Sequence, residues 1–362
     1  MGSGKFYLTR IISIKEEKII STGFRKILFI QIAILILVFT TSCDQSKTGN
    51  AIYTAYSTTP NKENITPASN VEKLLRVDEE RINDTIAKLC TENRSVGSDG
   101  ERKAADFIKS QLDKYGYETE METFPYSNQK NVLSRETFWD VFPSEDKVLG
   151  YSRNLIAYSR QNKIEETNII VISAHYDCAK SSPGANDNAA GVAALLEVAR
   201  RFKSVSKDFQ VEFIFFGGEE MSLSGSRNYI CRLNKSEKKS IIANINIDTI
   251  ANKDDDYPIF FTVNGKENLA TKILTSYKGN KKIQLEMACG ISDHFTFEQA
   301  GIPSLTIGQK PIHQKIHSPK DSIDTIDMEK VKFTILALTQ ALKQNFSDII
   351  LLNTKEPGTM VQ

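Results

Sequence analysis

Cysteine, tryptophan and excess charge of either sign are all scarce in this sequence. Its 362 residues include five cysteines and one tryptophan, and the formal net charge is +1. No two cysteines form a C-x-x-C pair, which argues against a zinc site built from thiolates. The sequence also lacks a dense run of lysine and arginine, so we do not expect nucleic-acid binding.

The apolar run near the N-terminus is short. Residues 27–39 (ILFIQIAILILVF) follow two basic residues and precede a Thr-Thr-Ser-Cys sequence that ends at Cys43. This length suits the core of a signal peptide better than a membrane-spanning helix. We therefore interpret residues 1–43 as a bacterial lipoprotein signal peptide, with lipid attached to Cys43 after cleavage. Thr40 stands where leucine is usual in such a site, and an uncleaved signal anchor is the alternative.

Both interpretations place the bulk of the chain outside the cytoplasm. We expect a protein of the cell envelope that is anchored to a membrane through its N-terminal lipid and faces the periplasm or the exterior. An export compartment permits disulfides. If Cys43 carries lipid, the other four cysteines allow three pairings, and the sequence does not choose among them.

The rest of the chain divides into a tether, one domain and a tail. Residues 44–70 are polar and have no hydrophobic periodicity, which predicts a flexible tether. The folded domain is expected over residues 71–350, and residues 351–362 form a C-terminal tail. Two helices and a β-hairpin with loops are predicted at the start of the domain, within residues 71–90, 100–116 and 117–160.

From about residue 167 onward, short apolar runs alternate with amphipathic helical segments. Strands are predicted at residues 168–173, 210–216, 242–247, 258–263 and 303–307. Helices are predicted at residues 189–202, 222–232, 266–277, 292–300 and 327–344. This alternation predicts an α/β fold in which a mostly parallel mixed β-sheet is sandwiched by helices.

Acidic residues and histidines follow several of the predicted strands directly. They are His175 and Asp177 in SAHYD, Asp187 in GANDNAAG, Glu219 and Glu220 in FFGGEE, Asp248 in NID, and His317 in IHSPKD. Ligands of such sheets bind beyond the carboxyl ends of the strands, so the topology alone gathers these side chains on one rim.

These residue types suit a pair of zinc ions. Zinc binds histidine nitrogen and carboxylate oxygen when no thiolate is offered. We expect one ion at His175 and Asp248 and the other at Glu220 and His317. The carboxylate of Asp187 would then bridge the two ions, because a loop rich in glycine and alanine allows close approach.

Two carboxylates are left for other roles. Asp177 stands two residues after His175 and is expected to hydrogen-bond its other ring nitrogen, which fixes the orientation of the ring. Glu219 is expected to act as general base and acid, taking a proton from a metal-bound water and passing it to a departing amine.

Six segments occur in an order typical of one enzyme family: SAHYD, GANDNAAGVAALLEVA, FFGGEE with SGSRNY, NID, SDHFTFEQAGIP and HSPKDSIDTID. Residues from about 71 to 345 thereby resemble the co-catalytic zinc aminopeptidases, secreted bacterial di-zinc exopeptidases related to glutamate carboxypeptidase and glutaminyl cyclase. The resemblance implies a phosphorylase/hydrolase-like fold and the residue roles given above. It also implies removal of N-terminal residues from peptide substrates, with two zinc ions per chain.

The sequence departs from the family pattern at a few positions. Asn186 and Asn188 flank Asp187 where acidic residues are frequent, and Thr249 follows Asp248 where methionine or leucine is common. None of these changes removes a ligand. They are expected to adjust the hydrogen bonds around the metals and the metal affinity.

Two other functions fit the same fold. Glutaminyl cyclases similar to this chain have a tryptophan directly before the last zinc-binding histidine, whereas Ile316 precedes His317 here. A non-catalytic relative would have lost metal ligands, and the ligand set here is intact. An exopeptidase is therefore preferred, although the sequence alone does not distinguish an aminopeptidase from a carboxypeptidase or dipeptidase.

Asp293 and His294 have two interpretations each. Ser292 and Asp293 either cap the following helix or belong to the site. His294 either contacts substrate or supports the residues around the metals. The sequence leaves these alternatives open, together with the side-chain preference and the oligomeric state.

Overall fold

A computed structural model of the chain describes residues 76–128, 138–159, 168–202, 209–288, 290–310 and 315–343. The predicted signal peptide with Cys43, the tether and the C-terminal tail lie outside these residues. Within the described part, no helix has the length and apolar character needed to cross a membrane. Three cysteines in it, Cys90, Cys178 and Cys231, have free thiols.

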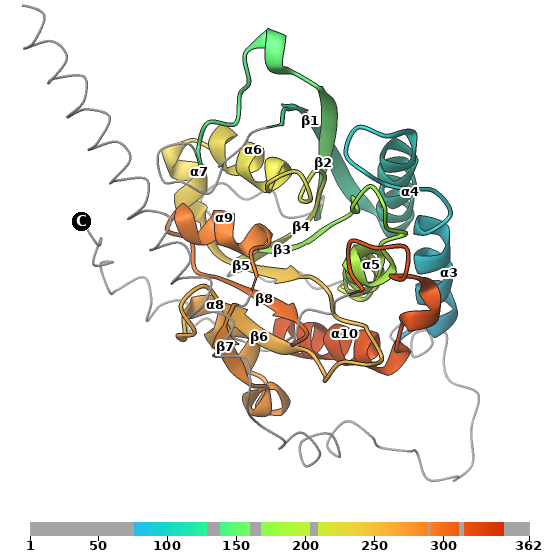
Figure 1. The fold of residues 1–362 in the computed structure, drawn as a ribbon. Coiled ribbons are helices and arrows are strands. Elements are labelled where there is room, and N and C mark those ends of the chain that lie inside the picture. The colour runs from blue at the N-terminus through green and yellow to red at the C-terminus, as the bar shows by residue number, and fades with distance from the viewer. Residues whose placement is uncertain are drawn as a thin grey trace, which may run out of the picture. The chain divides into compact units, whose positions relative to one another are not determined.

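The described residues form an eight-stranded sheet with the order β1-β2-β4-β3-β5-β8-β6-β7. The four central strands β4, β3, β5 and β8 are parallel, and β1, β2 and β6 run antiparallel to a neighbour (Figure 1). The strands are β1 (Tyr117–Tyr126), β2 (Gly150–Ser159), β3 (Asn168–His175), β4 (Phe209–Phe216), β5 (Ile241–Ile247), β6 (Ile259–Thr262), β7 (Leu285–Met287) and β8 (Ser304–Gly308). The predicted α/β class, with a mostly parallel mixed sheet, is confirmed.

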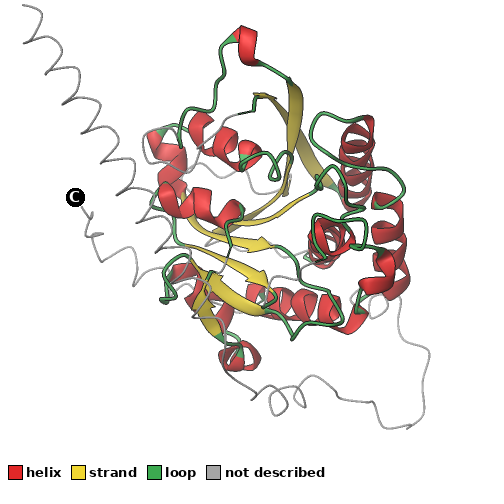
Figure 2. Ribbon diagram, viewed as in Figure 1, coloured by secondary structure: helices red, strands yellow, loops and turns green. Residues whose placement is uncertain are grey.

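Helices cover both faces of this sheet (Figure 2). Helices α5 and α10 lie on one side in Figure 1, whereas α6 and α9 lie on the other. The helices are α3 (Glu79–Leu89), α4 (Asp99–Tyr115), α5 (Ala190–Arg201), α6 (Ser224–Arg232), α7 (Lys235–Ser240), α8 (Leu269–Thr275), α9 (Asp293–Gln299) and α10 (Met328–Leu342).

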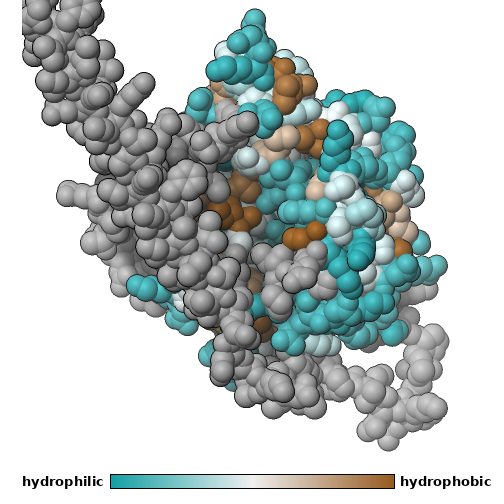
Figure 3. All heavy atoms as spheres, viewed as in Figure 1, coloured by the Kyte–Doolittle hydropathy of each residue, from teal (hydrophilic) through white to brown (hydrophobic). Residues whose placement is uncertain are grey.

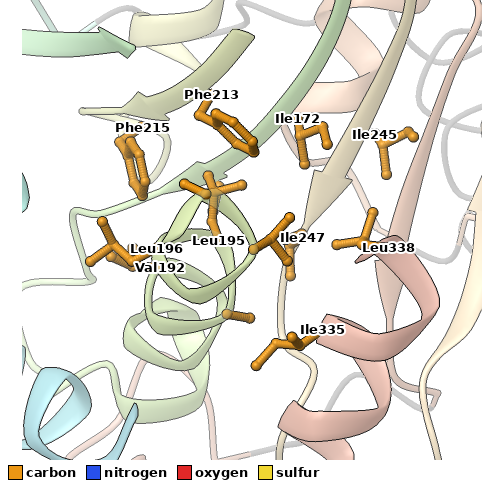
Figure 4. Close-up of a cluster of buried hydrophobic side chains, with 14 of the residues drawn as sticks. Ile172, Val192, Leu195, Leu196, Phe213, Phe215, Ile245, Ile247, Ile335 and Leu338 are labelled. Atoms are coloured by element: carbon orange, nitrogen blue, oxygen red, sulfur yellow. The ribbon is translucent and has the colours of Figure 1, made fainter. Parts of the chain in front are cut away.

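Alternating side chains of the central strands supply two cores. In β4, Phe213 and Phe215 belong to the larger core with α5 and α10, and Ile214 and Phe216 belong to the smaller core with α6 and α9. Successive side chains of a strand point to opposite faces, so apolar residues at every position bury both faces of the sheet. Figure 4 shows the larger core, where Leu195 and Leu338 from the two helices approach the strands.

Local signals explain where the helices begin and end. Gly116 follows α4 with φ 87°, a left-handed conformation that glycine adopts readily and that ends the helix. Helix α6 begins two residues later than predicted because Ser222 and Leu223 have positive φ angles. Helix α8 begins at Leu269, three residues late, because Asn268 caps it through the backbone N–H of Thr271. The short elements α7 and β7 were not predicted.

The surface seen in Figure 3 is mainly hydrophilic, with small separate hydrophobic patches. Several large apolar side chains are exposed in the described part, among them Phe142, Leu149 and Tyr151 around the β1–β2 connection. Scattered exposed apolar residues of this kind are ordinary on a folded domain.

Candidate metal centre and active site

The carboxyl ends of three parallel strands bring the predicted ligands together. His175 is the last residue of β3, and Asp248 directly follows β5. Glu219 and Glu220 follow β4 after two glycines. Because β4, β3 and β5 are parallel neighbours, their ends meet at one edge of the sheet, as the sequence predicts.

The first group of potential ligands surrounds His175. Its Nε2 lies 3.2 Å from Oδ1 of Asp187 and 3.4 Å from Oδ1 of Asp248. The ring is fully buried, yet neither of its nitrogens has a hydrogen-bond partner in the described structure. An imidazole nitrogen aimed at two carboxylate oxygens without a hydrogen bond is the arrangement expected around a cation.

The second group shares Asp187 with the first. Nε2 of His317 lies 3.0 Å from Oδ2 of Asp187 and 3.1 Å from Oε2 of Glu220. Within each group the candidate ligand atoms lie within 4.8 Å of one another. Thus one carboxylate oxygen of Asp187 faces His175 and Asp248, while the other faces His317 and Glu220.

The charges of these groups also suit cations. Burial raises the pKa of Glu219 well above its usual value; His175 opposes this shift, and the negative charge of Asp248 adds to it. Burial alone would lower the pKa of His175, but Glu219 and Asp248 raise it well above its usual value. Asp187 and Glu220 raise the pKa of His317 to about 10. Crowded carboxylates at a buried edge create a negative potential that divalent cations offset.

Asp321 holds the loop that carries Asp187. The two oxygens of the Asp321 carboxylate accept hydrogen bonds from the backbone N–H groups of Asn186 (2.8 Å) and Asp187 (3.1 Å). Asp321 itself is buried. Asp321 stands four residues after His317, so its hydrogen bonds link the segment of His317 to the loop of Asp187. The sequence did not reveal this role.

The two asparagines that flank Asp187 anchor the same loop to the sheet. Oδ1 of Asn186 accepts the N–H of Ala251 at 2.7 Å, and Nδ2 of Asn188 donates to the carbonyl of Ile247 at 2.8 Å. Both contacts reach the segment that contains Asp248. The amide groups thus connect the loop of Asp187 to the segment of Asp248, a candidate ligand of the first group.

Asp177 has more partners than the sequence suggests. Its Oδ1 lies 3.5 Å from Nδ1 of His175, the predicted partner, but no hydrogen bond joins the two atoms in this structure. Its two oxygens also accept the backbone N–H groups of Glu219 (3.0 Å) and Glu220 (3.2 Å). Asp177 therefore positions the glutamate pair relative to β3.

Arg94 is a further supporting residue that the sequence did not identify. Its buried guanidinium donates to the carbonyls of Tyr176 (2.8 Å), Pro183 (2.9 Å) and Gly184 (2.8 Å). These bonds connect the end of β3 to the start of the Asp187 loop. A single arginine in a polar segment before α4 carries no pattern that would indicate this role.

Asp293 and His294 lie at the start of α9, where Asp293 interacts electrostatically with His175 and Asp248, and His294 shares a pocket with Asp248. Ser292 occupies the N-cap position, but its side chain makes no capping hydrogen bond, so the helix-cap interpretation fails for that hydroxyl. Asp293 is fully buried, and burial is the main cause that raises its pKa to about 7. Nδ1 of His294 lies 2.6 Å from the Thr306 hydroxyl.

A solvent-open pocket of about 380 Å³, its mouth included, adjoins Asp248. Its wall includes Phe261, Ala288 and Ile291 as well as His294. A largely apolar cavity with a few polar groups, directly beside candidate catalytic residues, is typical of a substrate side-chain site.

We predict that Asp321→Asn weakens metal binding about 10- to 100-fold, as loss of outer-shell partners typically does. The amide would replace one accepting oxygen with a donor that faces a backbone N–H, so the Asp187 loop would lose a restraint. Competition with a chelator of known affinity measures the change. Asp324→Asn, at an exposed position nearby, serves as the control and should keep wild-type affinity. Equal affinities in the two variants would contradict the role given to Asp321.

Curated relatives resemble part of this chain. Aminopeptidase YwaD of Bacillus subtilis is 34% identical over 191 residues, which are 50% of this chain and 42% of that protein. Probable lipoprotein aminopeptidase LpqL of Mycobacterium tuberculosis is 33% identical over 172 residues, which are 42% of this chain and 33% of that protein. The chain thus spans less than half the length of these two relatives.

Solved structures share the fold. The aminopeptidase from Aneurinibacillus sp. strain AM-1 has a TM-score of 0.63 and 23% identity, with 75% of this chain and 94% of that chain covered. A glutaminyl cyclase of Porphyromonas gingivalis has a TM-score of 0.57 and 19% identity, with 74% and 98% covered. At these identities the similarity establishes the fold alone.

The family assignment comes from the sequence around the site. Residues 154–340, more than half of the chain, match Peptidase family M28. This span includes all five candidate metal ligands as well as Asp177 and Glu219. The chain therefore belongs to peptidase family M28.

Proposed function

We propose that this protein is a zinc-dependent aminopeptidase that removes N-terminal residues from peptides. The observation that carries the proposal is the division of the ligands into two groups around Asp187, each with one histidine and one further carboxylate. Glu219 lies beside them on the segment that Asp177 positions. The name of the relative YwaD, an aminopeptidase, supports the same activity.

The residues present fit two zinc ions. His175 and Asp248 would hold one ion and Glu220 and His317 the other, with Asp187 between them. Zinc in such a site lowers the pKa of a bound water and polarises the scissile carbonyl. Both groups leave room for substrate, because each offers fewer than four protein ligands when Asp187 is counted in both.

Glu219 would carry the proton. Its carboxylate accepts a proton from the attacking water and returns it to the leaving amine, as a general base and then a general acid. Asp177 holds the backbone of Glu219, so that the side chain starts from a fixed position. The pocket beside Asp248 would receive the side chain of the N-terminal residue.

A glutaminyl cyclase is the second candidate, since a cyclase has the same fold. Its reaction needs no bridging metal pair, whereas the geometry here provides for two ions around Asp187. The residue before His317 is Ile316 and not the tryptophan of the cyclases that resemble this chain. Both observations favour the peptidase.

A peptide-library digest read by mass spectrometry tests the proposal. We expect loss of single N-terminal residues, and inhibition by a chelator that zinc reverses. Glu219→Gln should lower kcat about 10²- to 10⁴-fold while metal content stays unchanged, because the base is lost and the ligands are kept. The exposed Glu267→Gln is the matched control and should retain activity.

Other digest results would refute the proposal. Loss of C-terminal residues would indicate a carboxypeptidase. Loss of ammonia from N-terminal glutamine without shortening of the peptide would indicate a cyclase. Near-normal activity of Glu219→Gln would remove this residue as the base.

We also propose that the protein is lipid-anchored at the cell envelope through Cys43. The basic residues, the apolar run and the small residues before Cys43 support this location. The name of the relative LpqL, a probable lipoprotein aminopeptidase, agrees with it.

Replacement of Cys43 by alanine should move the protein from the membrane fraction to the soluble fraction, because the lipid attachment site is lost. Fractionation of cells that express each form, followed by immunoblotting, measures this change. A membrane fraction that is the same for both forms would contradict lipid anchoring at Cys43. It would favour the uncleaved signal anchor instead.

A further inference from the structure

A series of buried polar side chains crosses the sheet from β3 to β8. Nδ2 of Asn244 donates to Oγ of Ser173 at 3.0 Å, and Oγ of Ser173 donates to Oδ1 of Asn246 at 2.9 Å. All three residues are completely buried. Buried polar side chains of this kind keep a fixed arrangement, because they have lost their hydrogen bonds to water and need partners within the protein.

The series continues to His294. Nδ2 of Asn246 donates to Oγ1 of Thr306 at 3.3 Å and to Oγ of Ser292 at 2.8 Å. Oγ1 of Thr306 lies 2.6 Å from Nδ1 of His294. We name these five residues the polar ladder: Ser173, Asn244, Asn246, Thr306 and His294.

The direction of the hydrogen bonds fixes the tautomer of His294. The Thr306 oxygen accepts an N–H from Asn246, and among the described residues the one acceptor left for its own hydrogen is Nδ1 of His294. Burial lowers the pKa of His294 to about 4, which leaves the ring neutral at pH 7. A neutral imidazole that accepts at Nδ1 carries its single hydrogen on Nε2.

The Nε2–H group of His294 has no partner among the described residues. His294 is 2% exposed, and it lines the pocket beside Asp248. The amide of Gln309, another lining residue, is already bonded to the backbone of Asn252 and Asp256. A buried donor without a partner, on a residue that lines a pocket, is a group that a bound molecule can satisfy.

We propose that the His294 Nε2–H selects substrates whose N-terminal side chain has an apolar stem and a neutral hydrogen-bond acceptor. Phe261, Ala288 and Ile291 contact the stem, and the Nε2–H donates to the acceptor. A carboxylate is disfavoured because the pocket adjoins Asp248, and no lysine or arginine is among the described residues that line it. This inference rests on the proposed aminopeptidase function, and it makes His294 a specificity residue and Thr306 a positioning residue.

A pair of isosteric substrates isolates this contact. Norleucine and O-methylhomoserine have side chains of the same length and differ only by an ether oxygen in place of a methylene. We expect kcat/KM to be about 2- to 10-fold higher for a peptide that begins with O-methylhomoserine, as one neutral hydrogen bond provides. N-terminal glutamine should share this advantage over lysine.

Three variants separate the donor from other roles of the side chain. His294→Gln keeps an N–H near the position of Nε2 and should preserve a preference for the ether. His294→Asn does not reach that position, so the ratio of the two kcat/KM values should fall to about one. Thr306→Val keeps the histidine but removes the hydrogen that its Nδ1 accepts, and should also reduce the ratio.

Two further measurements do not depend on turnover. Nitrogen-15 spectra of zinc-loaded protein labelled at histidine should show His294 protonated at Nε2 and unprotonated at Nδ1. Calorimetry with free norleucine and free O-methylhomoserine should show tighter binding of the ether. The opposite tautomer, or equal affinities, would overturn the inference.

The kinetic results distinguish this inference from the proposed function. Trimming of both peptides at equal rates would overturn the role of His294 and leave the aminopeptidase proposal standing. Trimming of neither peptide would overturn the aminopeptidase proposal, and calorimetry would then decide whether the pocket recognises an acceptor. Equal loss of both activities in His294→Asn, with the ratio unchanged, would make His294 a structural residue.

Discussion

The position of the Asp187 carboxylate is the constraint on which the rest of the site depends. One of its oxygens faces His175 and the other faces His317, although these histidines are far apart in the chain. A buried carboxylate between several others is unfavourable unless its backbone is fixed and cations offset the charge. The fold meets the first condition with buried hydrogen bonds from the Asp187 loop to Asp321, from Asn188 to the end of β5, and from Ala251 to Asn186.

The fold and the grouping of the candidate ligands could be predicted because they follow from local patterns. Apolar runs that alternate with amphipathic helices indicate a parallel sheet, and the ends of such strands gather at one edge. The contacts of Arg94 and Asp321 could not be predicted, because they join segments that are distant in sequence and no spacing encodes them. For the same reason the asparagines beside Asp187 looked like departures from a pattern, whereas they are anchors.

The central strands have two functions at once. The candidate metal ligands lie at their ends. Polar side chains within the strands form the polar ladder, which ends at His294. Asn244 and Asn246 stand in a strand that is otherwise apolar, and sequence reasoning gave them no role. Their burial requires partners, and those partners determine which nitrogen of His294 carries a hydrogen. Asn246 in β5 thus influences, through Thr306, which hydrogen-bonding group His294 offers.

We propose above all that Asp187 would bridge two metal ions. Titration of metal-free protein with zinc, followed by calorimetry and elemental analysis, tests it most directly. We predict two zinc ions per chain in the wild type and weaker binding of both ions in Asp187→Asn, because both groups share this carboxylate. A stable stoichiometry of one ion in the wild type, or loss of only one of two ions in Asp187→Asn, would contradict the account.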